Sequence, residues 1–129
     1  MADNTHHELA ITFLTAIEEQ DWTCLRRICV PGLLIWHNVD RENKIFFDYL
    51  PILVEFRRRA AGWKYRETGY WEAGNCFFRQ SLLDVRSVDG VDLTVATFII
   101  GEVTADRITR IDEYYNSADI APLLEASGN

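Results

Sequence analysis

The stretch RITRIDEYY, residues 107–115, contributes most to the prediction of the fold. Its partly alternating pattern of β-branched, aromatic and polar residues is typical of a half-buried β-strand. Side chains of a strand point alternately to opposite faces of a sheet, so Ile111 and Glu113 share one face while Arg110 and Asp112 share the other. If Ile111 faces the protein core, Glu113 faces the core as well.

Three segments upstream have the same character, namely residues 63–73, 75–87 and 91–102. They are separated from one another and from the closing strand by short breaks at Gly74-Asn75, Asp89-Gly90 and Thr104-Ala105-Asp106. Breaks this short join neighbouring antiparallel strands as hairpins. The second half of the chain is therefore predicted to be a meander of four long strands.

The first part of the chain predicts helices. Apolar residues recur at helical spacing over residues 5–19, and Thr5 and Glu8 have the spacing of a capping box. Asp21 can cap a second, short helix. Because proline and glycine interrupt helices, we expect Pro31-Gly32 to end this second helix.

The segments that follow are shorter. We expect a strand over residues 33–38, a polar loop over residues 40–43 and a helix over residues 45–60 that ends at Gly62. A last helical segment is expected over residues 117–125.

This order of elements predicts an α+β fold, with helices segregated to one face of the sheet. We expect a cone-shaped, curved antiparallel β-sheet packed on the N-terminal helices, with room for one small molecule inside. The chain has 129 residues and contains no repeat or linker, so residues 1–129 are predicted to form a single domain.

Composition narrows the expected partners. The formal net charge of -7 leaves no positive field for a phosphate backbone, so no nucleic-acid partner is expected. No apolar run approaches the roughly 18 residues of a membrane span, and no membrane partner is expected.

Three cysteines without a CxxC pair predict reduced thiols and a cytoplasmic location. No phosphate loop, metal signature or nucleophile motif is present, so we expect no cofactor and no metal site.

The stretch LLIWHN, residues 33–38, and the closing RITRIDEYYNSADIAPLL, residues 107–124, resemble the SnoaL-like branch of the nuclear transport factor 2-like superfamily. The pattern I-x-x-I-x-E-Y followed by a turn of small residues is the most specific part of this resemblance. The superfamily includes ketosteroid isomerases, limonene epoxide hydrolases, scytalone dehydratases, polyketide cyclases and proteins without catalytic activity, so its fold predicts more than its function does.

The resemblance implies one of two functions. The first is a cofactor-independent acid–base enzyme, of the isomerase, dehydratase or hydratase/epoxide hydrolase type, that acts on a small hydrophobic molecule. The second is a non-catalytic module of the same fold that binds a small ligand or dimerises. The resemblance also implies a homodimer formed through the outer face of the sheet, where Arg110, Asp112 and Tyr114 would lie.

Individual positions of the superfamily can be transferred to this chain. The base of ketosteroid isomerase falls on His37, while its two hydrogen-bond donors fall on Phe13 and near Phe98, which donate no hydrogen bond. Of the three charged residues of limonene epoxide hydrolase, only the carboxylate that falls on Glu113 is present. Among the positions that these two comparisons transfer to this chain, His37 and Glu113 are the ones with an ionisable side chain.

We therefore expect His37 and Glu113 to be the catalytic residues. An unperturbed histidine titrates near neutral pH, which suits it to move a proton, and a neighbouring carboxylate can orient its ring. Alternatives remain open at both positions. His37 could be a buried histidine bonded to the backbone, and Glu113 could pair with Arg79 or turn outward at a bulge.

Strand alternation predicts further polar residues in the same cavity. We expect the substrate-binding residues to be Arg79, Ser81, Thr97, Tyr115, Trp22 and Phe47. Arg79 or Ser81 would hold negative charge that develops on the substrate, and Trp22 and Phe47 would lie at the rim of the cavity.

Overall fold

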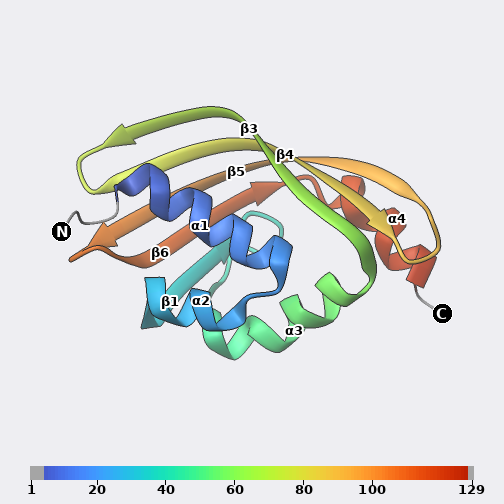
Figure 1. The fold of residues 1–129 in the computed structure, drawn as a ribbon, viewed down its shortest axis with the longest axis horizontal. Coiled ribbons are helices and arrows are strands. Elements are labelled where there is room, and N and C mark those ends of the chain that lie inside the picture. The colour runs from blue at the N-terminus through green and yellow to red at the C-terminus, as the bar shows by residue number, and fades with distance from the viewer. Residues whose placement is uncertain (1–4, 128–129) are drawn as a thin grey trace.

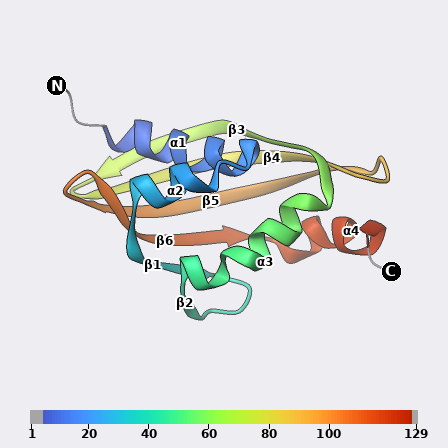
Figure 2. The same ribbon diagram turned by 60° about the horizontal axis from the view of Figure 1, so that its bottom comes forward.

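The computed structural model describes residues 5–127 and has the predicted α+β architecture, with helices packed on a curved sheet (Figure 1). The sheet contains six strands in the order β2-β1-β6-β5-β4-β3. Figures 1 and 2 show α1, α2 and α3 on the same side of this sheet. The elements in chain order are α1 (His6–Glu19), α2 (Trp22–Ile28), β1 (Cys29–His37), β2 (Asn43–Ile45), α3 (Phe46–Arg58), β3 (Ala60–Ala73), β4 (Cys76–Ser87), β5 (Asp92–Thr104), β6 (Arg107–Tyr115) and α4 (Ser117–Ser127).

The predicted helix starts are confirmed. Thr5 and Glu8 form a reciprocal capping box at the start of α1. The carboxylate of Asp21 accepts a hydrogen bond from the backbone N–H of Cys24 and thereby caps α2. The three hairpins of the meander are also confirmed, and Gly74 and Gly90 take up the positive φ that two of their turns require.

The start of β1 differs from the prediction. The strand begins at Cys29, and Pro31-Gly32 do not end α2 but lie within β1. The pairing of β1 with β6 is irregular between Cys29 and Leu34. Pro31 has no backbone N–H to donate, and it lies in this irregular part, where the regular hydrogen bonds between the strands are interrupted.

Two further boundaries differ from the prediction. Residues Asn43–Ile45 form the short strand β2 along β1, where the end of a loop and the start of a helix were expected. Helix α3 ends at Arg58, and Gly62 belongs to β3. The last helix, α4, extends to Ser127 and continues past Pro122.

The sheet is mixed and not wholly antiparallel as predicted. Strands β3 to β6 form the expected antiparallel meander, but β1 runs parallel to β6. In this parallel register Ile35 lies beside Ile111, and His37 lies beside Glu113. The unexpected strand direction therefore brings the two predicted catalytic residues next to each other on one face.

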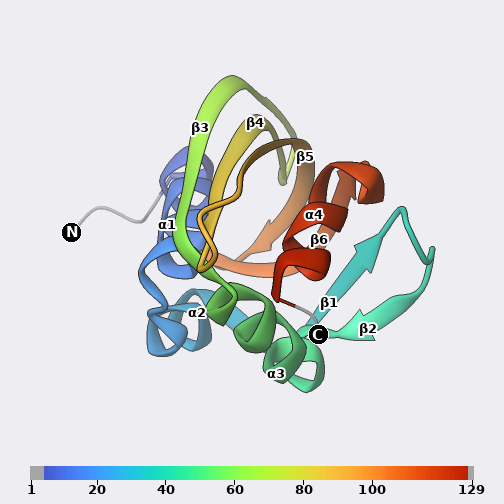
Figure 3. The same cartoon turned by 90° about the vertical axis from the view of Figure 1, so that its right-hand side faces the viewer.

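The curvature of the sheet has a local cause in β3. The pairing of β3 with β4 shifts register between Ala60 and Gly62 and again between Glu67 and Gly69. Such irregularities bend and twist a strand. Figure 3 shows the resulting curl of β3, β4 and β5 around α1, with α4 across the end of the sheet. No helix within residues 5–127 is long and apolar enough to cross a membrane.

Candidate active site

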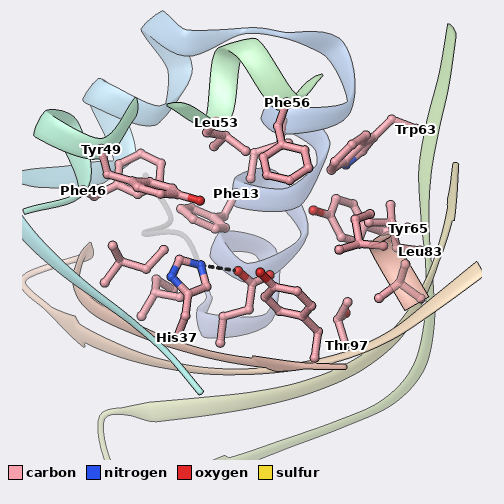
Figure 4. Close-up of a pocket in the computed structure, with 17 residues that line it drawn as sticks. Phe13, His37, Phe46, Tyr49, Leu53, Phe56, Trp63, Tyr65, Leu83 and Thr97 are labelled. Carbon is pink, nitrogen blue, oxygen red and sulfur yellow. Dashed lines mark hydrogen bonds and ion pairs between the residues drawn. The ribbon is translucent and has the colours of Figure 1, made fainter. Parts of the chain in front are cut away.

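A cavity of about 80 Å³ lies between the concave face of the sheet and helices α1 and α3 (Figure 4). One buried water needs roughly 10–15 Å³, so the cavity has room for several waters or for one small organic molecule. Its wall is mostly apolar and aromatic, and it consists of Phe13, Ile17, Ile35, His37, Phe46, Tyr49, Leu53, Phe56, Trp63, Tyr65, Leu83, Val95, Thr97, Ile111, Glu113, Tyr115 and Ile120.

His37 and Glu113 form a hydrogen-bonded pair in this wall. The distance between Nε2 of His37 and Oε1 of Glu113 is 2.8 Å. The side chain of His37 is 6% exposed, whereas that of Glu113 is 22% exposed. Glu113 is thus the more accessible member of the pair, whereas the His37 side chain is almost fully buried.

Neighbouring groups hold this pair in place. The side chain of Asn38 accepts a hydrogen bond from the backbone N–H of Tyr115 at 2.9 Å and donates one to the Tyr115 carbonyl at 3.0 Å. The backbone N–H of Asn38 donates to the carbonyl of Glu113. Asn38 therefore continues the pairing of β1 with β6 beyond His37, which fixes the register of the His37–Glu113 pair.

Three tyrosines surround the pair. The ring of His37 lies 5.5 Å from that of Tyr49 and 6.1 Å from that of Tyr115. Burial raises the pKa of Tyr49, Tyr65 and Tyr115, and the nearby Glu113 carboxylate raises each pKa further. The three phenols are therefore neutral hydrogen-bond donors at ordinary pH. Figure 4 shows the hydroxyls of Tyr49 and Tyr65 pointing into the cavity.

Two of the predicted substrate-binding residues, Thr97 and Tyr115, line the cavity. Arg79 and Ser81 are buried on the same face of the sheet but do not line it. Nε of Arg79 donates to Oγ of Ser81 at 2.8 Å, and Nη1 lies 3.4 Å from Oε1 of Glu67. Ile99 stands between Arg79 and Glu113 in the register of the sheet, so Glu113 pairs with His37 and not with Arg79.

Trp22 and Phe47 do not line the cavity either. Trp22 is partly buried against the hydrophobic core. The guanidinium of Arg26 lies 4.5 Å from the centre of the Phe47 ring, and Phe46 occupies the cavity wall in its place. One residue along a helix turns a side chain by about 100°, which explains why neighbouring phenylalanines face different surroundings.

The sequence prediction missed the polar groups that α3 and β3 contribute, which are Tyr49, Trp63 and Tyr65. Tyr49 could have been found from helical spacing, because Phe46, Tyr49, Leu53 and Phe56 recur at intervals of three and four residues and all line the cavity.

No group of three or more His, Cys, Asp and Glu side chains within residues 5–127 is arranged to hold a metal ion. The expectation of a cofactor-free protein stays a prediction. The chemistry that the described side chains can themselves supply is proton transfer by the His37–Glu113 pair and hydrogen bonding by the phenols.

Comparisons with known proteins support the fold. No protein-family model matches the sequence, and no curated protein matches it either. Among solved structures, IdmH of Streptomyces antibioticus, a proposed polyketide cyclase, has a TM-score of 0.83 at 10% identity, with 95% of this chain and 99% of that chain covered.

Two further solved structures match the chain, and one of them is assigned to a different reaction. A proposed SnoaL-like polyketide cyclase of Shewanella denitrificans has a TM-score of 0.79 at 11% identity, with coverages of 94% of this chain and 97% of that chain. An epoxide hydrolase of M. tuberculosis that resembles limonene epoxide hydrolase has a TM-score of 0.71 at 16% identity, with coverages of 92% and 87%. This chain therefore has the same fold as these SnoaL-like structures, as its sequence predicts.

Proposed function

We propose that this protein is a cofactor-independent enzyme that transfers a proton on a small, mainly apolar molecule bound in the cavity. The reaction class is an isomerisation, a dehydration, or the hydration of an alkene or epoxide. The catalytic pair consists of Glu113 and His37.

The observation that carries this proposal is the 2.8 Å hydrogen bond between His37 and Glu113 in a cavity wall that is mostly apolar and aromatic. An ionised carboxylate is costly in apolar surroundings unless it is paired. A pair that serves only structure has no need of an opening to a cavity, yet Glu113 keeps part of its side chain accessible there. Within the described chain, Oε2 of Glu113 has no hydrogen-bond partner and can meet a ligand.

The different exposures of the two side chains support different roles for them. Glu113 takes the proton from the substrate, or from a water that attacks it, because its carboxylate reaches the cavity. His37 orients this carboxylate through Oε1 and can share the proton through Nε2. The proton returns to another atom of the same substrate in an isomerisation, to the second alkene carbon in a hydration, or to the leaving oxygen in a dehydration or epoxide opening.

Two probe reactions test the proposal without knowledge of the physiological substrate. The first is the incorporation of deuterium next to the carbonyl of cyclohexanone in D2O, followed by NMR. The second is the hydration of cyclohexene oxide to the diol. We expect the wild-type chain to accelerate at least one of them and His37→Ala to abolish that acceleration while remaining folded by circular dichroism. Equal rates for the folded variant and the wild type would contradict the proposal.

The comparisons support an enzyme-type fold and leave the reaction open. The two Streptomyces and Shewanella proteins are proposed polyketide cyclases, while the M. tuberculosis protein is an epoxide hydrolase. Wild-type protein that binds apolar ligands in the cavity but accelerates neither probe reaction would favour the binding-module alternative.

We also propose that two copies associate through the outer face of the sheet. The rings of Trp36 and Tyr114 pack 5.3 Å apart on this face, and those of Phe78 and Phe98 pack 6.5 Å apart. Tyr114 is 40% exposed, so the aromatic cluster leaves apolar surface uncovered on this face. Light scattering should give a dimer for the wild type and a monomer for Tyr114→Lys; a monomeric wild type would contradict this proposal.

We propose the cytoplasm as the location of the protein. Cys24, Cys29 and Cys76 are free thiols, which persist in reducing compartments. Fractionation of cells that express the native gene should find the protein with cytoplasmic markers, and a secreted protein would contradict the proposal.

A further inference from the structure

The cavity wall contains a hydrogen-bond donor that the protein does not use. Nε1 of Trp63 is buried, and it forms no hydrogen bond with any part of the chain described over residues 5–127. An indole N–H can only donate, so an acceptor must come from elsewhere if it is to be satisfied. A buried donor left without a partner costs about 1–3 kcal/mol, which is a reason to expect that a bound molecule supplies the acceptor.

A second donor stands beside this indole. Tyr65 lies two residues further along β3, so both side chains point to the concave face, and both line the cavity. The Trp63 indole is near enough to the Tyr65 phenol to act against the rise in its pKa, but Nε1 of Trp63 does not reach the phenol in hydrogen-bonding geometry. Burial is the larger effect, so the pKa of Tyr65 is raised and the phenol stays protonated. Figure 4 shows the indole and the phenol across the cavity from His37.

The surrounding residues hold these two donors in position. The guanidinium of Arg57 lies 5.7 Å from the centre of the Trp63 ring. Arg57 is itself fixed by hydrogen bonds to the carbonyls of Ile17, Glu18 and Ala60. The backbone N–H of Tyr65 donates to Oε2 of Glu18 at 2.6 Å. The end of α1 and the start of β3 therefore fix the direction of both donors before any ligand binds.

The charge of the cavity wall restricts the acceptor. Among the described residues, no lysine or arginine lines the cavity, and His37 already pairs with Glu113. A ligand carboxylate would therefore be desolvated without a cation to neutralise it, which is unfavourable. A neutral oxygen, such as that of a ketone, an aldehyde or an ester, can accept from the indole and the phenol without this cost.

We infer that the indole N–H of Trp63 and the hydroxyl of Tyr65 form a subsite for one neutral carbonyl oxygen of the ligand. The ligand class is a small, mainly apolar carbonyl compound whose oxygen lies across the cavity from Glu113. This inference rests on the proposed use of the cavity as a substrate site, but its test needs binding alone.

The test uses two probes of the same shape, cyclohexanone and methylenecyclohexane, which differ by an oxygen in place of a CH2 group. Binding is followed by the ¹H–¹⁵N resonances of the four tryptophan indoles, with Trp63 assigned from Trp63→Phe. We expect the ketone to shift the Trp63 indole proton downfield and to bind more tightly than the alkene.

Substitutions locate the origin of this preference. Trp63→Phe and Tyr65→Phe should each weaken ketone binding by about 3- to 10-fold, as expected for one lost hydrogen bond, and leave alkene binding unchanged. Trp71→Phe and Tyr70→Phe are the matched controls, because these side chains also lie on β3 but do not line the cavity. Both controls should bind the ketone as the wild type does.

Three outcomes would overturn the inference. They are equal affinities for the two probes, a ketone preference that survives in both Trp63→Phe and Tyr65→Phe, and no ketone binding up to its solubility. Glu113→Gln separates this question from catalysis, since it should keep the ketone preference even if no reaction is catalysed. A wild-type protein that keeps the ketone preference but accelerates neither probe reaction would contradict only the proposed function.

Discussion

Two of the histidine–glutamate pairs within residues 5–127 have nearly equal lengths but lie in different surroundings. Nε2 of His37 lies 2.8 Å from Glu113, and Nε2 of His7 lies 2.7 Å from Glu67. The side chains of the first pair are 6% and 22% exposed, whereas those of the second are 40% and 32% exposed. The distance between donor and acceptor does not distinguish the pairs, so their roles must follow from what surrounds them.

The second pair has a different set of neighbours. Glu67 also lies 3.4 Å from the buried guanidinium of Arg79, and the ring of His7 stacks on that of Tyr70 at 3.8 Å. His7 belongs to the first turn of α1, while Glu67 and Tyr70 belong to β3. This pair therefore joins a helix to a strand and neutralises a buried arginine, whereas the His37–Glu113 pair opens to a cavity.

The largest expected difference is in catalysis. Glu113→Gln should reduce the rate of whichever probe reaction the wild type accelerates by about 10²- to 10⁴-fold, the usual contribution of a general base. Glu67→Gln should leave that rate within about twofold, because Glu67 does not line the cavity. Rates measured side by side check this, and equal losses in the two variants would remove the distinction between the pairs.

For the free energy of unfolding we expect the opposite order, with the larger loss in Glu67→Gln. Glu67→Gln leaves the Arg79 guanidinium buried without a carboxylate, which should lower the free energy of unfolding by about 2 kcal/mol. Glu113→Gln should cost less than about 1 kcal/mol, because the amide can still bond to His37. Urea denaturation of both variants compares them. A larger loss for Glu113→Gln would show that the cavity pair is the structural one.

Tyrosines near the two pairs should also contribute differently to stability at high pH. Burial raises the pKa of Tyr65 and of Tyr70 in the folded chain, while unfolded tyrosine ionises at pH about 10. The folded state holds these protons longer, so stability is fully present below pH about 10 and falls as the pH rises beyond it. Tyr65→Phe should reduce this fall more than Tyr70→Phe, because Tyr65 is buried and Tyr70 is only half-buried. Urea denaturation across this pH range measures the difference. A larger effect of Tyr70→Phe would mean that Tyr70, which stacks on His7, is desolvated more strongly than Tyr65.

The smallest expected effect is that of His7. The pair with Glu67 is substantially exposed, so His7→Gln should change the free energy of unfolding by less than about 1 kcal/mol at neutral pH. The effect should shrink further in high salt, because exposed charges are screened. A loss of stability well above this value that persists in salt would mean that the His7–Glu67 pair is desolvated. The exposed fractions would then not distinguish it from the His37–Glu113 pair.

The strand pattern predicted most of the fold because it depends on local alternation. Ile111, Glu113 and Tyr115 were placed on one face by parity, and all three line the cavity. The start of β1 was missed because Pro31-Gly32 within an irregular strand look the same in sequence as a helix stop. The parallel direction of β1 was missed because it depends on β6, more than 70 residues away.

The candidate site was predicted in part for a similar reason. Parity correctly placed Arg79 and Ser81 on the concave face, and both are buried there. Facing the concave side did not mean lining the cavity, because this part of β4 packs beside Glu67 instead. Trp63 and Tyr65 were missed as binding residues, because nothing in a sequence marks a buried donor that lacks a partner.

The central claim is that His37 and Glu113 act as one proton-transfer unit, and a double-mutant cycle on the probe reaction tests it most directly. The rates needed are those of the wild type, His37→Gln, Glu113→Gln and the double variant. Residues that act as a unit are strongly non-additive, so the double variant should lose about as much rate as the more damaged single variant. Losses that multiply, or either single variant at the wild-type rate, would contradict the claim.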